Sequence, residues 1–144
     1  MGQSATASHP APRAITDTAS ILLYSDNAKT RRAVRLAVGN AIGMRDVQIQ
    51  WTEVATAEVA MGEAEASVFD LVICDNETAK LGGVGLIRQM RNELDWQPVA
   101  LLIIARQQDA WLGAWSEADG AIMHPIDPFE LRQMVAEMLG LEDR

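Results

Sequence analysis

Short, continuously apolar runs alternate with longer segments of helical period along this chain, and this alternation limits the possible folds more than any other feature. Three apolar runs are predicted as buried strands: SILLY at 20–24, FDLVIC at 69–74 and QPVALLII at 97–104. A more polar strand is predicted at 47–54, at an edge of the sheet, and a short one at 121–123. Strands that alternate with helices predict an α/β domain with a parallel sheet.

Helical segments follow each of these strands, at 28–38, 56–66, 84–93, 109–118 and 128–139. Asn27 is placed to cap the first helix, and the sequence DPFE at 127–130 forms a capping box with proline at the first helical position. Five βα units account for the chain from residue 20 to its end. We therefore predict a flavodoxin-like (βα)5 fold, with strand order 2-1-3-4-5 and helices on both faces of the sheet.

The chain has 144 residues, of which 49% are hydrophobic and 22% charged, a composition typical of a globular domain. Residues 1–18 are rich in Ala, Ser, Thr and Pro and are predicted to be a disordered leader. Residues 19–142 are predicted to form one domain. We expect no separate output domain, because the length suits a single domain.

Charge and cysteine content narrow the class of protein. A net charge of −8 opposes binding to phosphate backbones, so we predict no nucleic-acid partner. No apolar run approaches the roughly 18–20 residues that cross a bilayer, and no signal peptide is recognisable, so we predict no membrane insertion. The single cysteine, Cys74, lies in an apolar run and is predicted to be a buried, inert thiol, which favours a cytoplasmic location.

Polar side chains at strand ends are the candidates for chemistry, because ligands of open parallel sheets bind beyond the carboxyl ends of the strands. Such ends carry Ser25 and Asp26, then Asp75, and finally His124. If the strands at 20–24 and 69–74 are neighbours, Asp26 and Asp75 face one crevice. Two carboxylates repel each other there unless a proton or cation intervenes, and hard oxygen ligands suit Mg²⁺.

These residues resemble those of the CheY-like receiver domains of response regulators over about Ser20 to Leu139. In DLVICDNE, Asp75 aligns with the phosphoacceptor, and Asp26 with a direct metal ligand. The backbone carbonyl of Glu77 would be the third protein ligand of a weakly bound Mg²⁺. The ending HPIDPFEL resembles the common KPFDPEEL, which implies a cis peptide bond between His124 and Pro125.

The departures from the family pattern imply an atypical receiver. Ser25 replaces the first acid, which would hold metal-bound water. Ile104, followed by Ala105, replaces the hydroxyl that couples phosphorylation to movement, and His124 replaces the lysine that neutralises phosphoryl charge. Ala121 stands at the position of the switch aromatic. The degenerate pocket is predicted to comprise Ser25, Ile104, Ala105, His124 and Pro125.

A narrower resemblance links the chain to stand-alone atypical receivers of actinobacteria, through YSDN at 24–27, QDAWL at 108–112 and HP.DP at 124–128. It implies a non-enzymatic, single-domain regulator of phosphorelay-type signalling that works through protein–protein contacts. The expected partner is a histidine kinase or another signalling protein. The contact surface, which also offers a route to a homodimer, would lie on the fourth helix and fifth strand at Trp111, Trp115 and Ala121.

Several alternatives stay open. Asp75 is either a phosphoacceptor in a conventional Mg²⁺-dependent regulator or a structural carboxylate, and Asp26 is either a metal ligand or a carboxylate stabilised by a helix dipole. His124 is either a substitute cation or a neutral hydrogen-bonded side chain. The four-residue spacing of Trp111 and Trp115 fits two helix positions that pack in the hydrophobic core, and it fits equally two positions in a protein–protein interface. Finally, DNET at 75–78 resembles the DxDxT motif of aspartyl-phosphate phosphatases.

Overall fold

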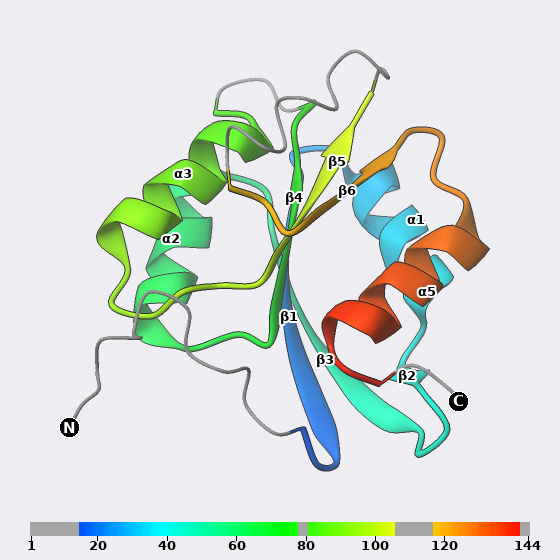
Figure 1. Ribbon diagram of the computed structural model, residues 1–144. Helices are drawn as coiled ribbons and strands as arrows, with labels where there is room; N and C mark the ends of the chain where they lie inside the picture. Colours follow the sequence, from blue (N-terminus) through cyan, green and yellow to red (C-terminus); the bar gives the residue numbers. More distant parts are fainter. Residues whose placement is uncertain (1–14, 78–80, 106–116, 142–144) are drawn as a thin grey trace, which may run out of the picture.

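The computed structural model describes residues 15–77, 81–105 and 117–141. Its centre is a sheet in the order β2-β3-β1-β4-β5-β6 (Figure 1). Every pairing except that of β2 with β3 is parallel. The parallel strands are β1 (Thr18–Tyr24), β3 (Val47–Val54), β4 (Leu71–Asp75), β5 (Ala100–Ile104) and β6 (Gly120–Met123). Numbered along the chain without β2, these five parallel strands lie in the order 2-1-3-4-5, which confirms the predicted α/β fold.

One strand was not predicted. The two-residue strand β2 (Ala41–Ile42) pairs antiparallel with the start of β3, so that Ala41 lies opposite Gln48 and Ile42 opposite Val47. The amide of Ile49 also donates to the carbonyl of Asn40 at 2.8 Å. The predicted edge strand 47–54 is therefore covered over its first residues by a short hairpin.

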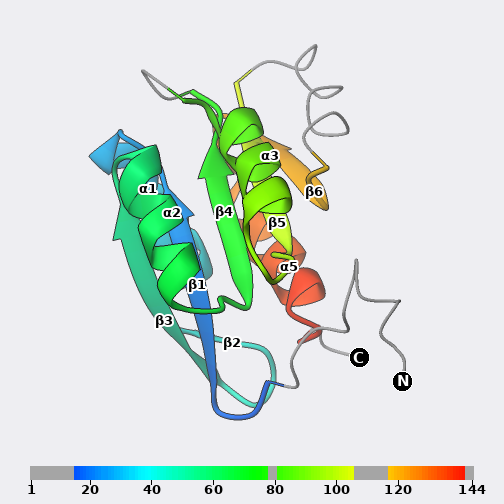
Figure 2. The ribbon, with the colours of Figure 1, turned by 90° about the vertical axis from the view of Figure 1, so that its left-hand side faces the viewer.

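Helices cover both faces of the sheet. They are α1 (Ala28–Val38), α2 (Ala57–Ala66), α3 (Gly83–Glu93) and α5 (Pro128–Met138). Figure 1 shows α1 and α5 on one face and α2 and α3 on the other, and Figure 2 looks onto the α2 and α3 face. The helix predicted at 109–118 falls outside the described residues except for its last two positions, and so do Trp111 and Trp115.

The first and last helices have the N-terminal caps that the sequence predicted. The side chain of Asn27 accepts hydrogen bonds from the amides of Lys29 and Thr30, and that of Asp127 accepts them from the amides of Phe129 and Glu130. These side chains satisfy donors that a helix N-terminus leaves without intrahelical partners. The predicted starts at 28 and 128 are thus confirmed.

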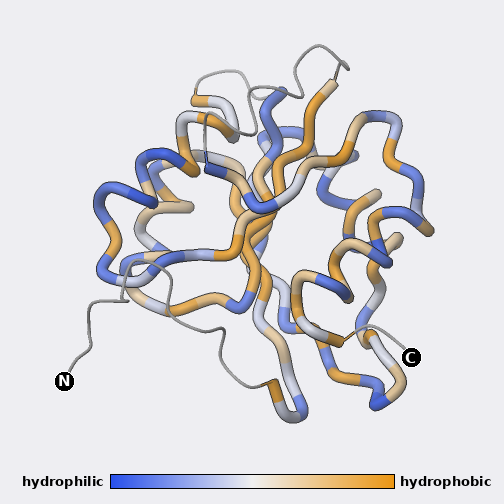
Figure 3. The backbone as a smooth tube through the Cα atoms, in the orientation of Figure 1, coloured by the Kyte–Doolittle hydropathy of each residue, from blue (hydrophilic) through white to orange (hydrophobic). Residues whose placement is uncertain are grey.

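Among the described residues, two hydrophobic clusters form the core, one on each face of the sheet. Successive side chains of a strand point to opposite faces. Accordingly Ile21 and Leu23 of β1 pack with the α1 and α5 cluster, whereas Leu22 and Tyr24 pack with the α2 and α3 cluster. Figure 3 shows the hydrophobic colour concentrated along the central strands. Every residue of β4 and β5 is buried, which explains their continuous apolar sequences.

Residues 15–18, which belong to the predicted leader, contact the folded domain. β1 begins at Thr18, and the carbonyl of Asp17 accepts a 2.9 Å hydrogen bond from the amide of Gln48. Ile15 is partly buried against the α1 and α5 cluster. Residues 1–14 lie outside the described part of the chain. None of the helices within the described ranges is long and apolar enough to cross a membrane.

Candidate functional site

Backbone hydrogen bonds extend the sheet just past its strand ends and bring three predicted site residues together. The amide of Ser25 donates to the carbonyl of Val54 at 3.2 Å, and the amide of His124 donates to that of Ile104 at 2.8 Å. Between them, Asp75 is the last residue of β4. Ser25, Asp75 and His124 thereby share the carboxyl edge of the sheet, as the sequence predicted.

Asp75 is buried, with 1% of its surface exposed, and both of its carboxylate oxygens have partners within the chain. Oδ2 accepts a 2.7 Å hydrogen bond from the hydroxyl of Ser25. Oδ1 accepts a 2.9 Å bond from the amide of Glu77 and lies 3.7 Å from Nε2 of His124. A buried carboxylate without such donors would be strongly destabilising. We refer to Ser25, Asp75, the Glu77 amide and His124 as the Asp75 network.

Ser25 connects this network to α1. Its hydroxyl oxygen accepts a 3.1 Å hydrogen bond from the amide of Asn27, the residue that caps α1. Its carbonyl accepts a 2.6 Å bond from the guanidinium of Arg31. The role of Ser25 as a donor to Asp75 was not predicted, because the sequence indicated only that an acid had been replaced.

The other predicted pocket positions differ in exposure. Ile104 is 2% exposed and belongs to the core cluster under α2 and α3. Ala105 is partly buried and Pro125 is exposed. The His124–Pro125 peptide bond is cis, as the resemblance implied. Ala121 is partly buried against the same core cluster as Ile104.

Comparison with known proteins places the chain in a family. It is 36% identical over 119 residues to an uncharacterised response regulatory protein of Mycobacterium tuberculosis, found in two strains, and the match covers 83% of this chain and 90% of the relative. The chain belongs to the response regulators. No family model matches this response regulator.

Solved structures agree on the fold of this response regulator. The receiver domain of the Francisella response regulator 1452 matches with a TM-score of 0.71 at 16% identity, over 85% of this chain and 97% of that one. Chemotaxis protein CheY4 of Vibrio cholerae matches with a TM-score of 0.67 at 18% identity, over 84% and 98%. The described fold is that of a CheY-like receiver domain.

The magnesium ligands predicted for this receiver are two carboxylates, those of Asp26 and Asp75, and one backbone carbonyl, that of Glu77. Among residues 15–77, 81–105 and 117–141, no group of three or more His, Cys, Asp and Glu side chains could hold a metal ion. The side chains of Asp26 and Glu77 are exposed, and both oxygens of Asp75 already accept hydrogen bonds. Weak Mg²⁺ binding by Asp26, Asp75 and the Glu77 carbonyl stays a prediction.

Cys74 precedes Asp75 and is fully buried, as predicted. Burial raises the pKa of its thiol far above the ordinary range, and the nearby negative charge of Asp75 raises it further. Since the thiolate is the reactive form, Cys74 in the folded receiver is inert.

Two of the basic residues of α1 form ion pairs with an acidic residue of β3. Nε of Arg31 lies 3.2 Å from Oε1 of Glu53, and Nε of Arg35 lies 2.5 Å from Oε2 of the same carboxylate. These two ion pairs join α1 to β3. Glu53 therefore offsets part of the positive charge of α1.

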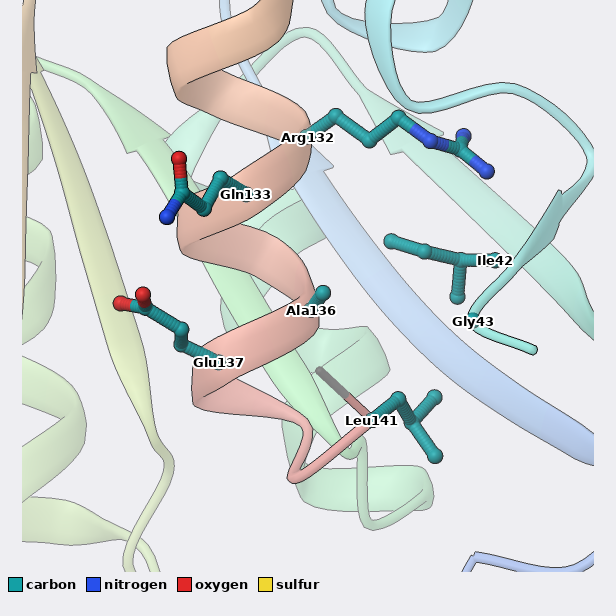
Figure 4. A pocket seen from close by; sticks show the side chains of 7 residues that line it. All are labelled: Ile42, Gly43, Arg132, Gln133, Ala136, Glu137 and Leu141. Atoms are coloured by element: carbon teal, nitrogen blue, oxygen red, sulfur yellow. The ribbon is translucent and has the colours of Figure 1, made fainter. Parts of the chain in front are cut away.

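Two cavities lined by described residues were not predicted. The larger, about 410 Å³, lies between α5 and the β2 hairpin, far from the Asp75 network (Figure 4). In Figure 4 Arg132 reaches toward the hairpin, whereas Gln133 and Glu137 point the other way. Arg132 donates to the carbonyls of Val38 and Ala41, so its guanidinium serves to hold α5 against the end of α1. The smaller cavity adjoins Tyr24 and Asp26.

Proposed function

We propose that this receiver is an atypical response regulator whose phosphoacceptor pocket is degenerate and which acts in phosphorelay-type signalling through protein–protein contacts, without enzymatic activity. The observation that carries the proposal is the 2.7 Å hydrogen bond from Ser25 to the buried carboxylate of Asp75. A phosphoacceptor must present a carboxylate oxygen to an incoming phosphoryl group. Here each oxygen already accepts a hydrogen bond from a donor of the chain.

The surroundings of Asp75 support the same proposal. Ile104 offers no hydroxyl for a phosphoryl oxygen, and the nearest cationic candidate among the described residues is the imidazole of His124, 3.7 Å away. Preorganised positive charge and donors are what stabilise a transferring phosphoryl group. At Ala121, in place of the switch aromatic, there is no ring to rotate. The two side chains that would couple phosphorylation to surface movement, a hydroxyl at position 104 and an aromatic ring at position 121, are therefore absent.

Exposed apolar side chains near the same edge favour a protein partner, such as a histidine kinase or another signalling protein. Phe129, in the first turn of α5, is 85% exposed, and Met123, at the end of β6, is 41% exposed. Large apolar side chains in contact with water commonly mark contact surfaces. Contacts through Trp111 and Trp115 remain a prediction, since both lie outside the described residues.

The decisive experiment compares the wild type with a restored receiver, Ser25→Asp, Ile104→Thr and His124→Lys combined. Each is incubated with acetyl phosphate and Mg²⁺, and the mass shift at Asp75 is measured. We expect no shift for the wild type and phosphorylation of the restored variant. Asp75→Asn in the restored background is the control and should abolish the shift.

Phosphorylation of the wild type at a rate matching the restored variant would refute the proposal and support a conventional Asp75-phosphorylated, Mg²⁺-dependent regulator. Turnover of p-nitrophenyl phosphate that Asp75→Asn removes would instead indicate the small aspartyl-phosphate phosphatase suggested by DNET. We expect neither result.

A further inference from the structure

A continuous series of hydrogen bonds and ion pairs leads from the buried carboxylate of Asp75 to the surface formed by α1 and β3. Its first link is the 2.7 Å bond from the hydroxyl of Ser25 to Asp75. The carbonyl of the same serine accepts a 2.6 Å bond from Arg31, whose Nε donates to Oε1 of Glu53 at 3.2 Å. Oε2 of Glu53 lies 2.5 Å from Nε of Arg35. The proposed function uses none of the three charged residues at the surface end.

Ser25 is a firm link in this series, because its backbone is hydrogen-bonded on both sides. Its amide donates to the carbonyl of Val54 at 3.2 Å, and its carbonyl accepts from the guanidinium of Arg31. The residue is fully buried. Electrostatic interactions and hydrogen bonds are stronger in a buried environment than in water. A change in the charge of Asp75 therefore alters the position of Ser25 and its 2.6 Å contact with Arg31.

The charges along the series balance, with two carboxylates, Asp75 and Glu53, and two guanidinium groups, Arg31 and Arg35. Arg31 stands between the carboxylates in the order of contacts, since it bonds Glu53 directly and reaches Asp75 through Ser25. Both carboxylates attract its positive charge. Loss of the charge on Asp75 removes one of them, so the guanidinium of Arg31 then pairs more strongly with Glu53.

Glu53 provides an element with two arrangements. Arg31 makes a directed hydrogen bond to its carboxylate, whereas the buried Nε of Arg35 makes no hydrogen bond within the described residues despite its short contact. A carboxylate can accept a bidentate pair of hydrogen bonds from either guanidinium. The position of Arg31 therefore decides which arginine holds Glu53. Elements with two discrete arrangements are what carry energetic coupling between separate sites.

The surface end of the series is accessible to a partner protein. The side chains of Arg31, Glu53 and Arg35 are 20%, 31% and 40% exposed, whereas Asp75 is buried. A partner can thus contact Glu53 without reaching Asp75. Because coupling between two sites is reciprocal, a partner that displaces Glu53 from Arg31 also changes how Asp75 is held.

We propose that Arg31 is a positioning residue that couples the charge of Asp75 to the position of the Glu53 carboxylate. A partner at the α1 and β3 surface then sets, by the same coupling, how firmly Ser25 holds Asp75. This inference goes beyond the proposed function by naming a route that takes the place of the side chains absent at positions 104 and 121. It stands whether or not Asp75 is phosphorylated, because it depends on the charge of the carboxylate.

The first test compares the arginine Nε–H signals of isotope-labelled wild type and Asp75→Asn by NMR. We expect the signals of Arg31 and Arg35 to shift. Asp70→Asn is the matched control, because Asp70 also accepts a hydrogen bond from a serine hydroxyl of β1, that of Ser20, at the opposite end of β1 and β4. This control should leave both arginine signals unchanged.

The second test measures the coupling in the reverse direction, at the carboxyl carbon signal of Asp75. Glu53→Gln should shift this signal, because Arg31 then loses its surface partner and its bond to Ser25 changes. Glu65→Gln, which removes an exposed charge from α2, should not shift it. This measurement keeps Asp75 in place, so it decides the matter if Asp75→Asn fails to fold.

A double-mutant cycle separates coupling through Arg31 from direct repulsion between the two carboxylates. Urea unfolding is measured for Asp75→Asn, Glu53→Gln and the double variant. Their unfolding equilibrium constants should depart from additivity by roughly twofold or more. In an Arg31→Met background the same cycle should be additive, whereas direct repulsion would persist. The amide spectrum of each variant shows whether the fold is intact.

Unchanged Arg31 and Arg35 signals in a folded Asp75→Asn variant would overturn the proposal, as would non-additivity that survives Arg31→Met. An unshifted Asp75 carbon signal in Glu53→Gln would overturn it as well. Rapid phosphorylation of the wild type by acetyl phosphate would refute the proposed function and leave this coupling intact. The two failures are therefore distinguishable.

Discussion

The hydroxyl of Ser25 donates to Oδ2 of Asp75 across 2.7 Å, and neither residue has more than 1% of its surface exposed. The bond joins the end of β1 to the end of β4 where receivers of the common pattern have two acids. A serine at this position supplies a donor in place of a like charge. The buried carboxylate is thereby stabilised by a neutral hydrogen-bond donor.

Ser25→Ala should lower the free energy of unfolding by about 1–3 kcal/mol, because the buried Oδ2 of Asp75 loses its donor and the partly buried amide of Asn27 loses its acceptor. Urea unfolding followed by circular dichroism measures the change. Ser67→Ala, at an exposed position, is the matched control and should stay within about 0.5 kcal/mol of wild type. Equal stability of the two variants would contradict the structural importance of this bond.

Gly83 and Gly62 form a pair of opposite predictions. A Cβ at Gly83 would come within 2.7 Å of Cδ1 of Leu102 and 2.9 Å of the carbonyl oxygen of Cys74, so Gly83→Ala should destabilise the fold by about 1–3 kcal/mol. A Cβ at Gly62, within α2, meets nothing within 4 Å, so Gly62→Ala should stabilise by about 0.5–1 kcal/mol. Thermal unfolding of both variants should show midpoints on opposite sides of the wild type.

Cys74 should resist iodoacetamide in the folded protein at mildly alkaline pH, because burial and the charge of Asp75 raise the pKa of its thiol and remove the reactive thiolate. The same thiol should be alkylated readily in denaturing guanidinium chloride. Mass spectrometry of time points gives both rates. Alkylation of the native protein as fast as that of the denatured protein would show that Cys74 is accessible.

Arg91 of α3 should contribute substantially to the stability of the fold. Its side chain is 5% exposed, donates to the carbonyls of Pro98 and Glu117, and pairs with Asp119 at 3.0 Å. Asp119 also accepts from the amide of Ala100, so the group ties α3 to the starts of β5 and β6.

Arg91→Met should destabilise by about 1–3 kcal/mol, a range set below that of a fully buried pair because Asp119 is 43% exposed and screened by solvent. Lys29→Met, which removes an exposed charge from α1, is the control and should change stability by less than about 0.5 kcal/mol. Urea unfolding of both variants checks the prediction. A loss for Arg91→Met no greater than that for Lys29→Met would refute it.

The strand segments and the helix starts at 28 and 128 could be predicted because they depend on local signals, whereas the sheet order followed from the predicted (βα)5 fold class. Apolar runs at 20–24 and 69–74 mark strands buried on both faces, and Asn27 and Asp127 cap the helices that they precede. Strand β2 escaped prediction, since two residues carry no periodicity. Strand β5 begins at Ala100 rather than at 97, because the apolar run extends beyond the residues that pair with β4.

The candidate site could be predicted only in part. Sequence identified Asp75 and the three replaced residues, since strand ends of a parallel sheet converge. It could not show that Ser25 points at Asp75 rather than at solvent, or that Asp26 borders an apolar cavity with Tyr24 and Glu58. Those relationships depend on side-chain directions set by contacts between segments far apart in the chain.

The short strand β2 has a consequence for behaviour in solution. An uncovered edge strand offers a row of backbone donors and acceptors to a second molecule. Here the hairpin takes the first part of the β3 edge, and the remainder carries Gln50, Thr52 and Glu53, with Glu53 held by Arg31 and Arg35. Both features work against sheet extension from one chain to the next, so this edge is protected against aggregation.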